Sequence, residues 1–152
     1  MGFVCQGRYA LAPIEPTDAE KYVNLQLDCM EQTYDPIYFD TLGESFTARH
    51  RAERNEYLED FHRHLSSPTV RGFFAYEVPG WTPDGGLSCS IGARINWDKP
   101  VGLALSLCEP SSWELERADN LPELPAGTRK LAHLYTLNHT HGTGLGQALY
   151  ES

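Results

Sequence analysis

Residues 131–150 of the chain read LAHLYTLNHTHGTGLGQALY. Residues 131–137 are rich in apolar and aromatic side chains and predict a β-strand. A loop with three glycines follows at once, Gly142, Gly144 and Gly146, and a helix begins at residues 147–149. Glycines allow consecutive backbone amides to turn toward one anion, and a helix start adds unpaired N–H donors and a partial positive charge. The segment therefore predicts an anion-binding loop with phosphate or pyrophosphate as its ligand.

Two common nucleotide-binding loops do not fit this spacing. A Walker A loop needs a lysine followed by Ser or Thr. Residues 142–147 contain no lysine and therefore no Lys-Ser or Lys-Thr pair. A dinucleotide-binding loop needs GxGxxG, but Gln147 stands where the third glycine or alanine should be. That loop should also open a βαβ unit with an acidic residue about 20 residues further on, and only six residues follow Gly146.

The remaining pattern is [Gln/Arg]xxGx[Gly/Ala], which residues 141–146 follow except at His141. Here the sequence resembles the GNAT superfamily of N-acetyltransferases, in which this loop binds the pyrophosphate of acetyl-CoA through its backbone amides. The resemblance extends back through residues 134–137, which look like the family's Leu-Tyr-Val strand. It also covers the order strand, two helices, two or three strands, loop and helix. It implies an α/β fold with a mixed sheet (α+β), of the acyl-CoA N-acyltransferase type, in one domain over residues 1–152.

Two departures from the family accompany this resemblance. His141 stands where the family usually has Gln or Arg, although an imidazole can still donate a hydrogen bond to a phosphate oxygen. Family members also continue after the loop helix with a strand, a further helix and closing strands. The resemblance therefore implies a domain that is incomplete at its C-terminus, cut after the start of that helix. The tyrosine that serves the family as general acid belongs to the missing part, and Tyr150 does not inherit its role.

Turn residues and hydrophobic periodicity predict the other elements. Thr17-Asp18-Ala19-Glu20 forms a capping box that opens the first helix, which shows apolar residues three or four apart and is expected to end at Asp35-Pro36. The strand 101–108 is apolar throughout, which indicates burial on both faces. The remaining expectations are a strand at 7–12, a second helix from Ser45 or Thr47 to about Leu65, a strand at 71–78, and loops at 79–100 and 109–128.

The resemblance assigns the acetyl-CoA contacts to the end of the last strand and to the loop: Tyr135, Thr136, Leu137, His141, Gly142, Thr143, Gly144, Leu145, Gly146 and Gln147. In the family, a backbone amide of that strand polarises the thioester carbonyl, which places it here near Tyr135 to Leu137. His133 is the one group on this strand that titrates near neutral pH, so it is the candidate general base. The alternative is a packing or surface histidine.

Three aromatic residues, Tyr34, Tyr38 and Phe39, fall in the region that lines the acceptor pocket in the family. Core packing is the alternative for them. No metal site is expected, because the cysteines lack CxxC spacing and because His62 and His64, two apart on a helix, point to different sides.

Charge and composition narrow the function further. The chain has 152 residues with 12 Lys+Arg against 21 Asp+Glu, a net charge of −9, which disfavours nucleic acid and anionic membranes and suits an amine. Four scattered cysteines and the lack of a signal-like segment predict a cytoplasmic protein.

The expected function is N-acetyltransferase: direct attack of a primary amine, on a small molecule or peptide, on the thioester of acetyl-CoA. Two alternatives stay open, a non-catalytic CoA-binding or degenerate acetyltransferase-like module and a plain protein-interaction domain. The acceptor and the oligomeric state are undetermined, although an unpaired edge at residues 131–137 would allow a homodimer.

Overall fold

A computed structural model describes residues 2–42, 45–85, 91–109 and 124–152. These residues form one mixed α/β unit with a five-stranded antiparallel sheet in the order β1-β2-β3-β4-β5. The strands are β1 Val4–Gln6, β2 Tyr9–Pro13, β3 Arg71–Glu77, β4 Gly102–Leu107 and β5 Lys130–Thr136. The helices are α1 Ala19–Leu42, α2 Phe46–Ala52, α3 Arg54–Leu65 and α5 Leu145–Glu151, with short 3₁₀ turns η1 Pro16–Asp18, η2 Ile91–Arg94 and η3 Asn138–Thr140.

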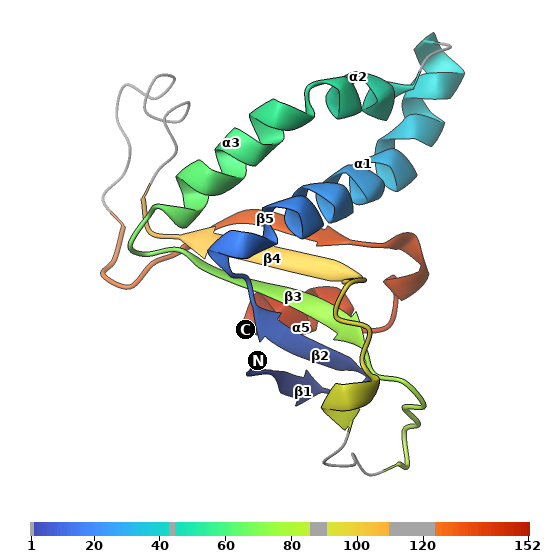
Figure 1. Cartoon of the computed structure of the whole chain (residues 1–152), viewed down its shortest axis with the longest axis vertical. Coiled ribbons are helices and arrows are strands. Elements are labelled where there is room, and N and C mark those ends of the chain that lie inside the picture. The colour runs from blue at the N-terminus through green and yellow to red at the C-terminus, as the bar shows by residue number, and fades with distance from the viewer. Residues whose placement is uncertain (1, 43–44, 86–90, 110–123) are drawn as a thin grey trace.

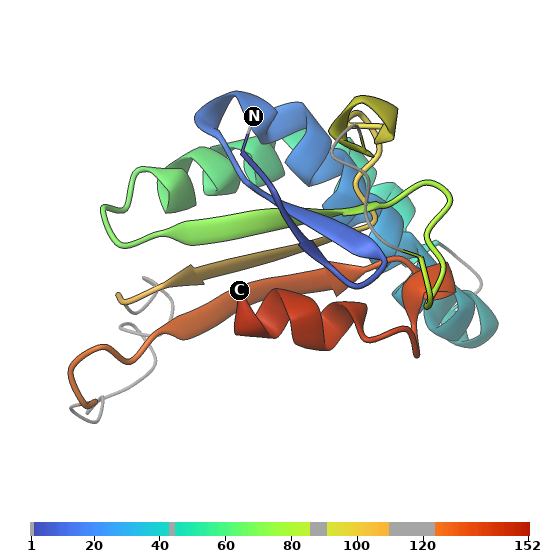
Figure 2. The same cartoon turned by 90° about the horizontal axis from the view of Figure 1, so that it is seen from below.

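The sheet lies between two helical layers. Helices α1, α2 and α3 lie on one side and α5 lies on the other (Figures 1 and 2). The order strand, helices, strands, loop and helix is the one that the resemblance to the acetyltransferases implies. The described residues contain no helix that is long and apolar enough to cross a membrane.

Strand β4, which lies between β3 and β5, is buried on both faces, as its apolar sequence predicts. Leu103 and Leu105 pack into the core beneath α1 and α3, whereas Ala104 packs with Leu145 and Leu149 of α5. Strand residues alternate between the two faces of a sheet, so each helical layer receives every second side chain. Strands β3 and β5 also lie where the sequence predicts strands.

Helix α5 approaches β4 very closely at Gly102. A Cβ atom at Gly102 would lie 3.0 Å from Leu149 Cδ1, 3.1 Å from Leu145 Cδ2 and 3.3 Å from the backbone oxygen of Tyr135. Few real Cβ contacts are this short, so a side chain at this position would require the leucines of α5 to shift by a few tenths of an ångström. Gly102 therefore sets the position of α5 and of the loop that precedes it.

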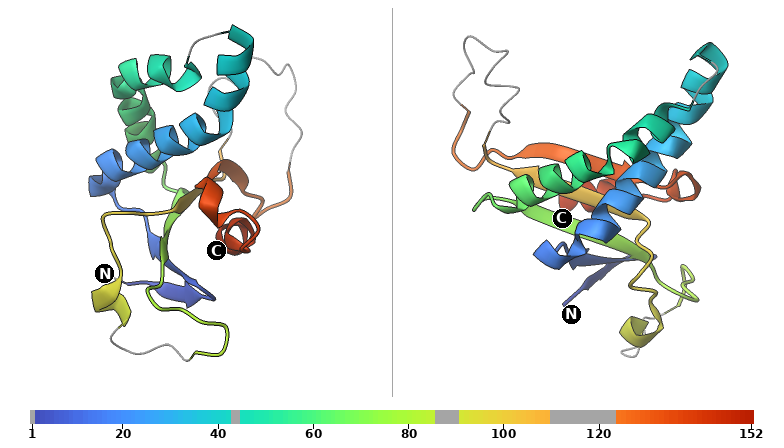
Figure 3. Two further views of the ribbon diagram at one scale, coloured as in Figure 1. Left: turned by 90° about the vertical axis from the view of Figure 1, so that its right-hand side faces the viewer. Right: turned by 45° about the horizontal axis from the view of Figure 1, so that its top comes forward.

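The expected end of the first helix at Asp35-Pro36 is wrong, because α1 continues to Leu42 with Pro36 inside it. Proline removes one helical hydrogen bond and favours a bend, and α1 changes direction in its second half (Figure 3, left). Contacts with α2 stabilise the continuation. The Asp35 carboxylate accepts hydrogen bonds from Ser45 Oγ at 2.6 Å and from Thr47 N at 2.8 Å, which also lower the pKa of Asp35.

Other boundaries differ from the expected ones. The single second helix is two, α2 and α3, because the backbone leaves the helical region at Glu53, where φ is −94° and ψ is 22°. The first predicted strand, β2, begins at Tyr9 rather than at residue 7. Strand β1, which pairs with it, was not predicted. The stretch 79–100 contains η2. Part of the loop 109–128 lies outside the described residues.

We expect Gly102→Val to destabilise the protein by about 1–3 kcal/mol, because the added methyl groups overpack the contact with α5. Urea unfolding followed by circular dichroism measures this loss. The double variant Gly102→Val/Leu149→Ala should lose less free energy of unfolding than the two single variants lose together. The reason is that the Leu149 methyl groups are among the atoms that the valine meets. Full stability of Gly102→Val would contradict the close packing of α5.

Candidate functional site

The predicted glycine loop follows β5 directly and is held at its start by the two neighbouring elements. Leu137 N donates to Val101 O at 3.0 Å, and Asn138 N donates to the Gln32 side chain of α1 at 2.7 Å. The chain then makes the turn η3, in which His141 N donates to Asn138 O at 3.1 Å. These bonds fix where the chain leaves the sheet.

Two of the three glycines have a backbone that other residues rarely adopt. Gly142 has φ 79° and Gly144 has φ 87°, and both lie in the left-handed region that favours glycine. Gly146 is different, because it lies in the first turn of α5 with no positive φ, and a Cβ there would meet nothing within 4 Å. The fold therefore accounts for Gly142 and Gly144 but leaves Gly146 unexplained, and the open backbone at Gly146 fits the approach of a ligand.

Hydroxyl groups fix the middle of the loop. Thr140 is 2% exposed, and its hydroxyl donates to Leu137 O at 2.6 Å. Thr143 Oγ1 donates to Thr140 O, so its single proton is used there. The hydroxyl of Tyr9, 2.7 Å from Thr143 Oγ1, must then be the donor in that pair. The hydrogen bond from Tyr9 therefore ties the loop to strand β2, which lies three strands away from β5 in the sheet.

The remaining predicted loop residues divide by burial. Leu145 is 1% exposed and packs on β4, so only its backbone is available to a ligand. His141 is exposed. Gln147 is also exposed, and its side chain donates to Glu151 Oε1 at 2.9 Å. Besides the exposed side chains of His141 and Gln147, the donors that this loop offers are its backbone amides.

Strand β5 is an edge of the sheet in the described part of the chain, as predicted. Leu137 N points toward β4, since it donates to Val101 O. Successive residues of a strand turn their backbone groups to opposite sides, so the amide of Thr136 points away from β4. Of Tyr135, Thr136 and Leu137, Thr136 thus presents its amide on the unpaired side. Tyr135 turns its side chain into the layer of α1, where burial raises its pKa and Gln26 is a hydrogen-bond partner.

His133 lies on the same face of β5 as Tyr135 and is largely enclosed. Its Nδ1 lies 2.5 Å from the hydroxyl of Tyr22, which is 1% exposed. Its ring centroid is 5.3 Å from that of His64. Burial, followed by the charge of His64, lowers the pKa of His133 from 6.5 to about 4. The ring is therefore neutral at neutral pH, and the bond at Nδ1 decides whether Nε2 is a donor or a free base.

The aromatic residues predicted to line an acceptor pocket lie on the second half of α1. The Phe46 ring of α2 packs against three other rings. Its centroid lies 5.3 Å from that of Tyr34, 4.6 Å from that of Tyr38 and 4.3 Å from that of His50. Phe39 is 59% exposed. The structure thus brings Tyr34 and Tyr38 together with two residues, Phe46 and His50, that the sequence pattern did not single out. Tyr34 also contributes to the raised pKa of Tyr135.

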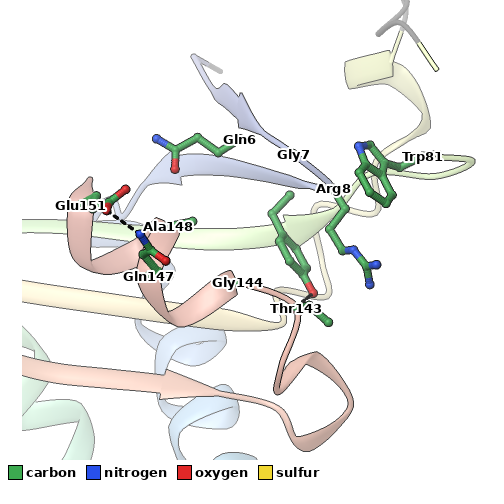
Figure 4. Close-up of a pocket in the computed structure, with 10 residues that line it drawn as sticks. Gln6, Gly7, Arg8, Trp81, Thr143, Gly144, Gln147, Ala148 and Glu151 are labelled. Carbon is green, nitrogen blue, oxygen red and sulfur yellow. Dashed lines mark hydrogen bonds between the residues drawn. The ribbon is translucent and has the colours of Figure 1, made fainter. Parts of the chain in front are cut away.

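An open groove of about 310 Å³ adjoins the glycine loop (Figure 4). Thr143, Gly144 and Gln147 line one wall, and Arg8 and Trp81 belong to the other. Sequence reasoning missed Arg8 and Trp81, because the contact that brings them to the loop joins segments more than 60 residues apart. In the described part of the chain, no cluster of three or more His, Cys, Asp or Glu side chains could hold a metal ion.

Comparisons with known proteins include a distant likeness to a solved structure. No family model matches the chain, and no curated protein matches its sequence. A solved structure of AAC(6')-Iy, in complex with the bisubstrate analog CoA-S-monomethyl-acetylneamine, is 13% identical. The match covers 94% of this chain and 67% of that chain, with a TM-score of 0.48. This likeness is too distant to assign an activity, which must be argued from the chain's own residues.

We expect His133 to make the protein less stable as the pH falls from about 6.5 to about 4. In this range the unfolded chain takes up a proton at His133 that the folded chain does not, so the free energy of unfolding decreases. His133→Gln should show a flatter pH dependence than the wild type in urea unfolding at pH 6.5, 5.5 and 4.5. His139→Gln, which changes a 58% exposed side chain, is the control. Equal slopes for His133→Gln and the wild type would show that His133 is not shielded from protonation.

Proposed function

We propose that the chain is an N-acetyltransferase that transfers the acetyl group of acetyl-CoA to a primary amine. The observation that carries this proposal is the glycine loop at the end of an edge strand. Its backbone is left-handed at Gly142 and Gly144, and it is open at Gly146 for no reason that the fold supplies. The same segment carries the sequence resemblance to the GNAT superfamily.

The donors at this loop suit a pyrophosphate. Ala148 N is the first amide of α5 with a helical partner, Gly144 O at 3.0 Å, so the amides of Leu145, Gly146 and Gln147 have no partner within the helix. Several N–H groups are therefore available side by side to phosphate oxygens. His141, exposed at the start of the loop, can add a side-chain donor.

The chemistry requires three events: the amine nitrogen bonds to the carbonyl carbon, the carbon–sulfur bond breaks so that CoA leaves as a thiolate that takes up a proton from solvent, and the amine loses a proton to a base. The outward amide of Thr136 is the candidate donor to the carbonyl oxygen as negative charge develops on it. His133 is the candidate base, because it is neutral at neutral pH. It can accept a proton at Nε2 only when Nδ1 carries the other proton and donates it to Tyr22 Oη.

The acceptor is a primary amine, on a small molecule or a peptide, that we place near the aromatic cluster of Tyr34, Tyr38 and Phe46. Aromatic faces bind ammonium groups and apolar parts of a substrate, and Tyr34 and Tyr38 remain 40% and 37% exposed. The cluster adjoins the face of β5 that carries Tyr135, as the electrostatic contribution of Tyr34 to the pKa of Tyr135 indicates.

A second function, CoA binding without turnover, is favoured by one observation. A base with a pKa of about 4 is a weak proton acceptor, because general bases work best with a pKa near the operating pH. If Tyr22 donates to Nδ1, moreover, Nε2 carries the proton and His133 cannot act as a base at all. Release of free CoA thiol in the presence of a panel of primary amines distinguishes the two functions.

Gly146→Asp should abolish acetyl-CoA binding, because its carboxylate would stand among the amides that receive the pyrophosphate. The change is compatible with the fold, since a Cβ there meets nothing and an acidic residue suits the first turn of a helix. Isothermal titration calorimetry measures the dissociation constant for acetyl-CoA. Gly144 is the poorer test, since any residue but glycine is strained at φ 87°.

Gly146→Ala is the matched control and should keep its affinity for acetyl-CoA, because the pattern [Gln/Arg]xxGx[Gly/Ala] admits alanine at this position and the change adds no charge. Alanine adds only a methyl group and should stabilise α5 by about 0.5–1 kcal/mol relative to glycine. Loss of binding in Gly146→Asp with a folded protein supports the proposed site. Equal affinity of the wild type and Gly146→Asp for acetyl-CoA would exclude the loop as the pyrophosphate site.

A further inference from the structure

The groove beside the glycine loop has a wall that the resemblance to the acetyltransferases does not assign. The turn between β1 and β2 supplies Arg8, and the segment after β3 supplies Trp81. Figure 4 shows both side chains at the end of the groove where Thr143 lies, with Glu151 and Gln147 at the other end. The volume of about 310 Å³ is at the lower limit of ligand-binding clefts.

Arg8 is placed to bind an anion that offers several oxygen acceptors. Its guanidinium carbon lies 4.9 Å from the centre of the Trp81 ring, a cation–π arrangement. No hydrogen bond of the Arg8 guanidinium is found among the described residues, and guanidinium N–H groups match the oxygens of a phosphate. Within the described residues no carboxylate lies at ion-pairing distance from Arg8. In a chain of net charge −9, such an arginine is available to an external anion.

The groove changes character along its length. At the Arg8 end, the guanidinium supplies the N–H donors beside Gly144, because the hydroxyl protons of Tyr9 and Thr143 are used in hydrogen bonds within the protein. About 10 Å further along α5, by the rise of 1.5 Å per residue, Glu151 accepts a hydrogen bond from the Gln147 side chain. One end therefore suits phosphate oxygens, and the other end suits a group that donates hydrogen bonds.

We propose that this groove receives the phosphorylated adenosine end of acetyl-CoA, with Arg8 paired to one of its phosphate groups. The adenine amino group supplies the donor that the Glu151 end can accept, and Trp81 holds the guanidinium in place. The inference rests on the proposed function. It deepens that function by naming Arg8, from a segment remote in sequence from the loop, as a determinant of affinity for the phosphorylated cosubstrate.

Arg8→Gln tests the proposal, because it removes the charge at an exposed position without disturbing the core. Calorimetric titrations with acetyl-CoA and with adenosine 3′,5′-bisphosphate should give affinities at least about tenfold weaker than for the wild type, as expected for a lost charge-assisted hydrogen bond. Arg63→Gln is the matched control, since it removes an equal charge from a 66% exposed side chain on α3, on the other side of the sheet. The control should bind both ligands as the wild type does.

Dephospho-CoA identifies which phosphate Arg8 binds. If Arg8→Gln weakens acetyl-CoA but not dephospho-CoA, the partner is the 3′-phosphate, and if it weakens both, the partner is the pyrophosphate; either result supports the proposal. Equal affinities of Arg8→Gln and Arg63→Gln for acetyl-CoA would overturn it while leaving the proposed function intact. A wild-type protein that binds no acetyl-CoA would overturn the proposed function itself.

Discussion

The contact between α5 and Gly102 of β4 fixes the position of the whole candidate site. Leu145 and Leu149, one helical turn apart, lie on this glycine at distances that a side chain there would force to lengthen by a few tenths of an ångström. The helix in turn sets the position of Gly144 at its N-terminal end. The loop is therefore tied to the sheet at both ends, by α5 on β4 and by the bond from Leu137 to Val101. Loop residues held in this way can be pre-organised for a ligand without being buried.

Strand β5 combines two properties that rarely occur together. Its edge is unpaired within the described residues, so Thr136 offers a backbone amide to a substrate, yet its inner face is enclosed by α1 and α3. Enclosure moves the pKa of His133 far below its usual value and fixes its Nδ1 on Tyr22. The same burial that gives a neutral imidazole at pH 7 also makes it a weak base. In the proposed reaction, His133 can therefore act as a base only when Nδ1 carries its proton.

The sequence predicts this fold where local composition and tertiary contacts agree. Strands β3, β4 and β5 are apolar or aromatic runs between turn residues, and the glycine loop has a backbone that its sequence demands. Prediction fails where a distant contact overrides the local signal. Pro36 normally ends a helix, but α1 continues because Asp35 and Tyr38 bond and stack with α2. No sequence pattern could place Arg8 and Trp81 beside Thr143, since only the pairing of β2 with β3 and the Tyr9–Thr143 bond bring them there.

The charge of the chain acts differently on the two substrates of the proposed reaction. A net charge of −9 repels an anionic cosubstrate at long range and attracts a cationic amine. Short-range donors must therefore supply the affinity for phosphate. The backbone amides of the loop carry only partial charge, and His139 is paired with Glu77. Arg8 is thus the full positive charge that the groove itself contains, and its stacking on Trp81 keeps that charge beside the loop. In the proposed reaction, the acidic surface favours the approach of the amine, and Arg8 offsets the repulsion of the phosphate groups at the groove.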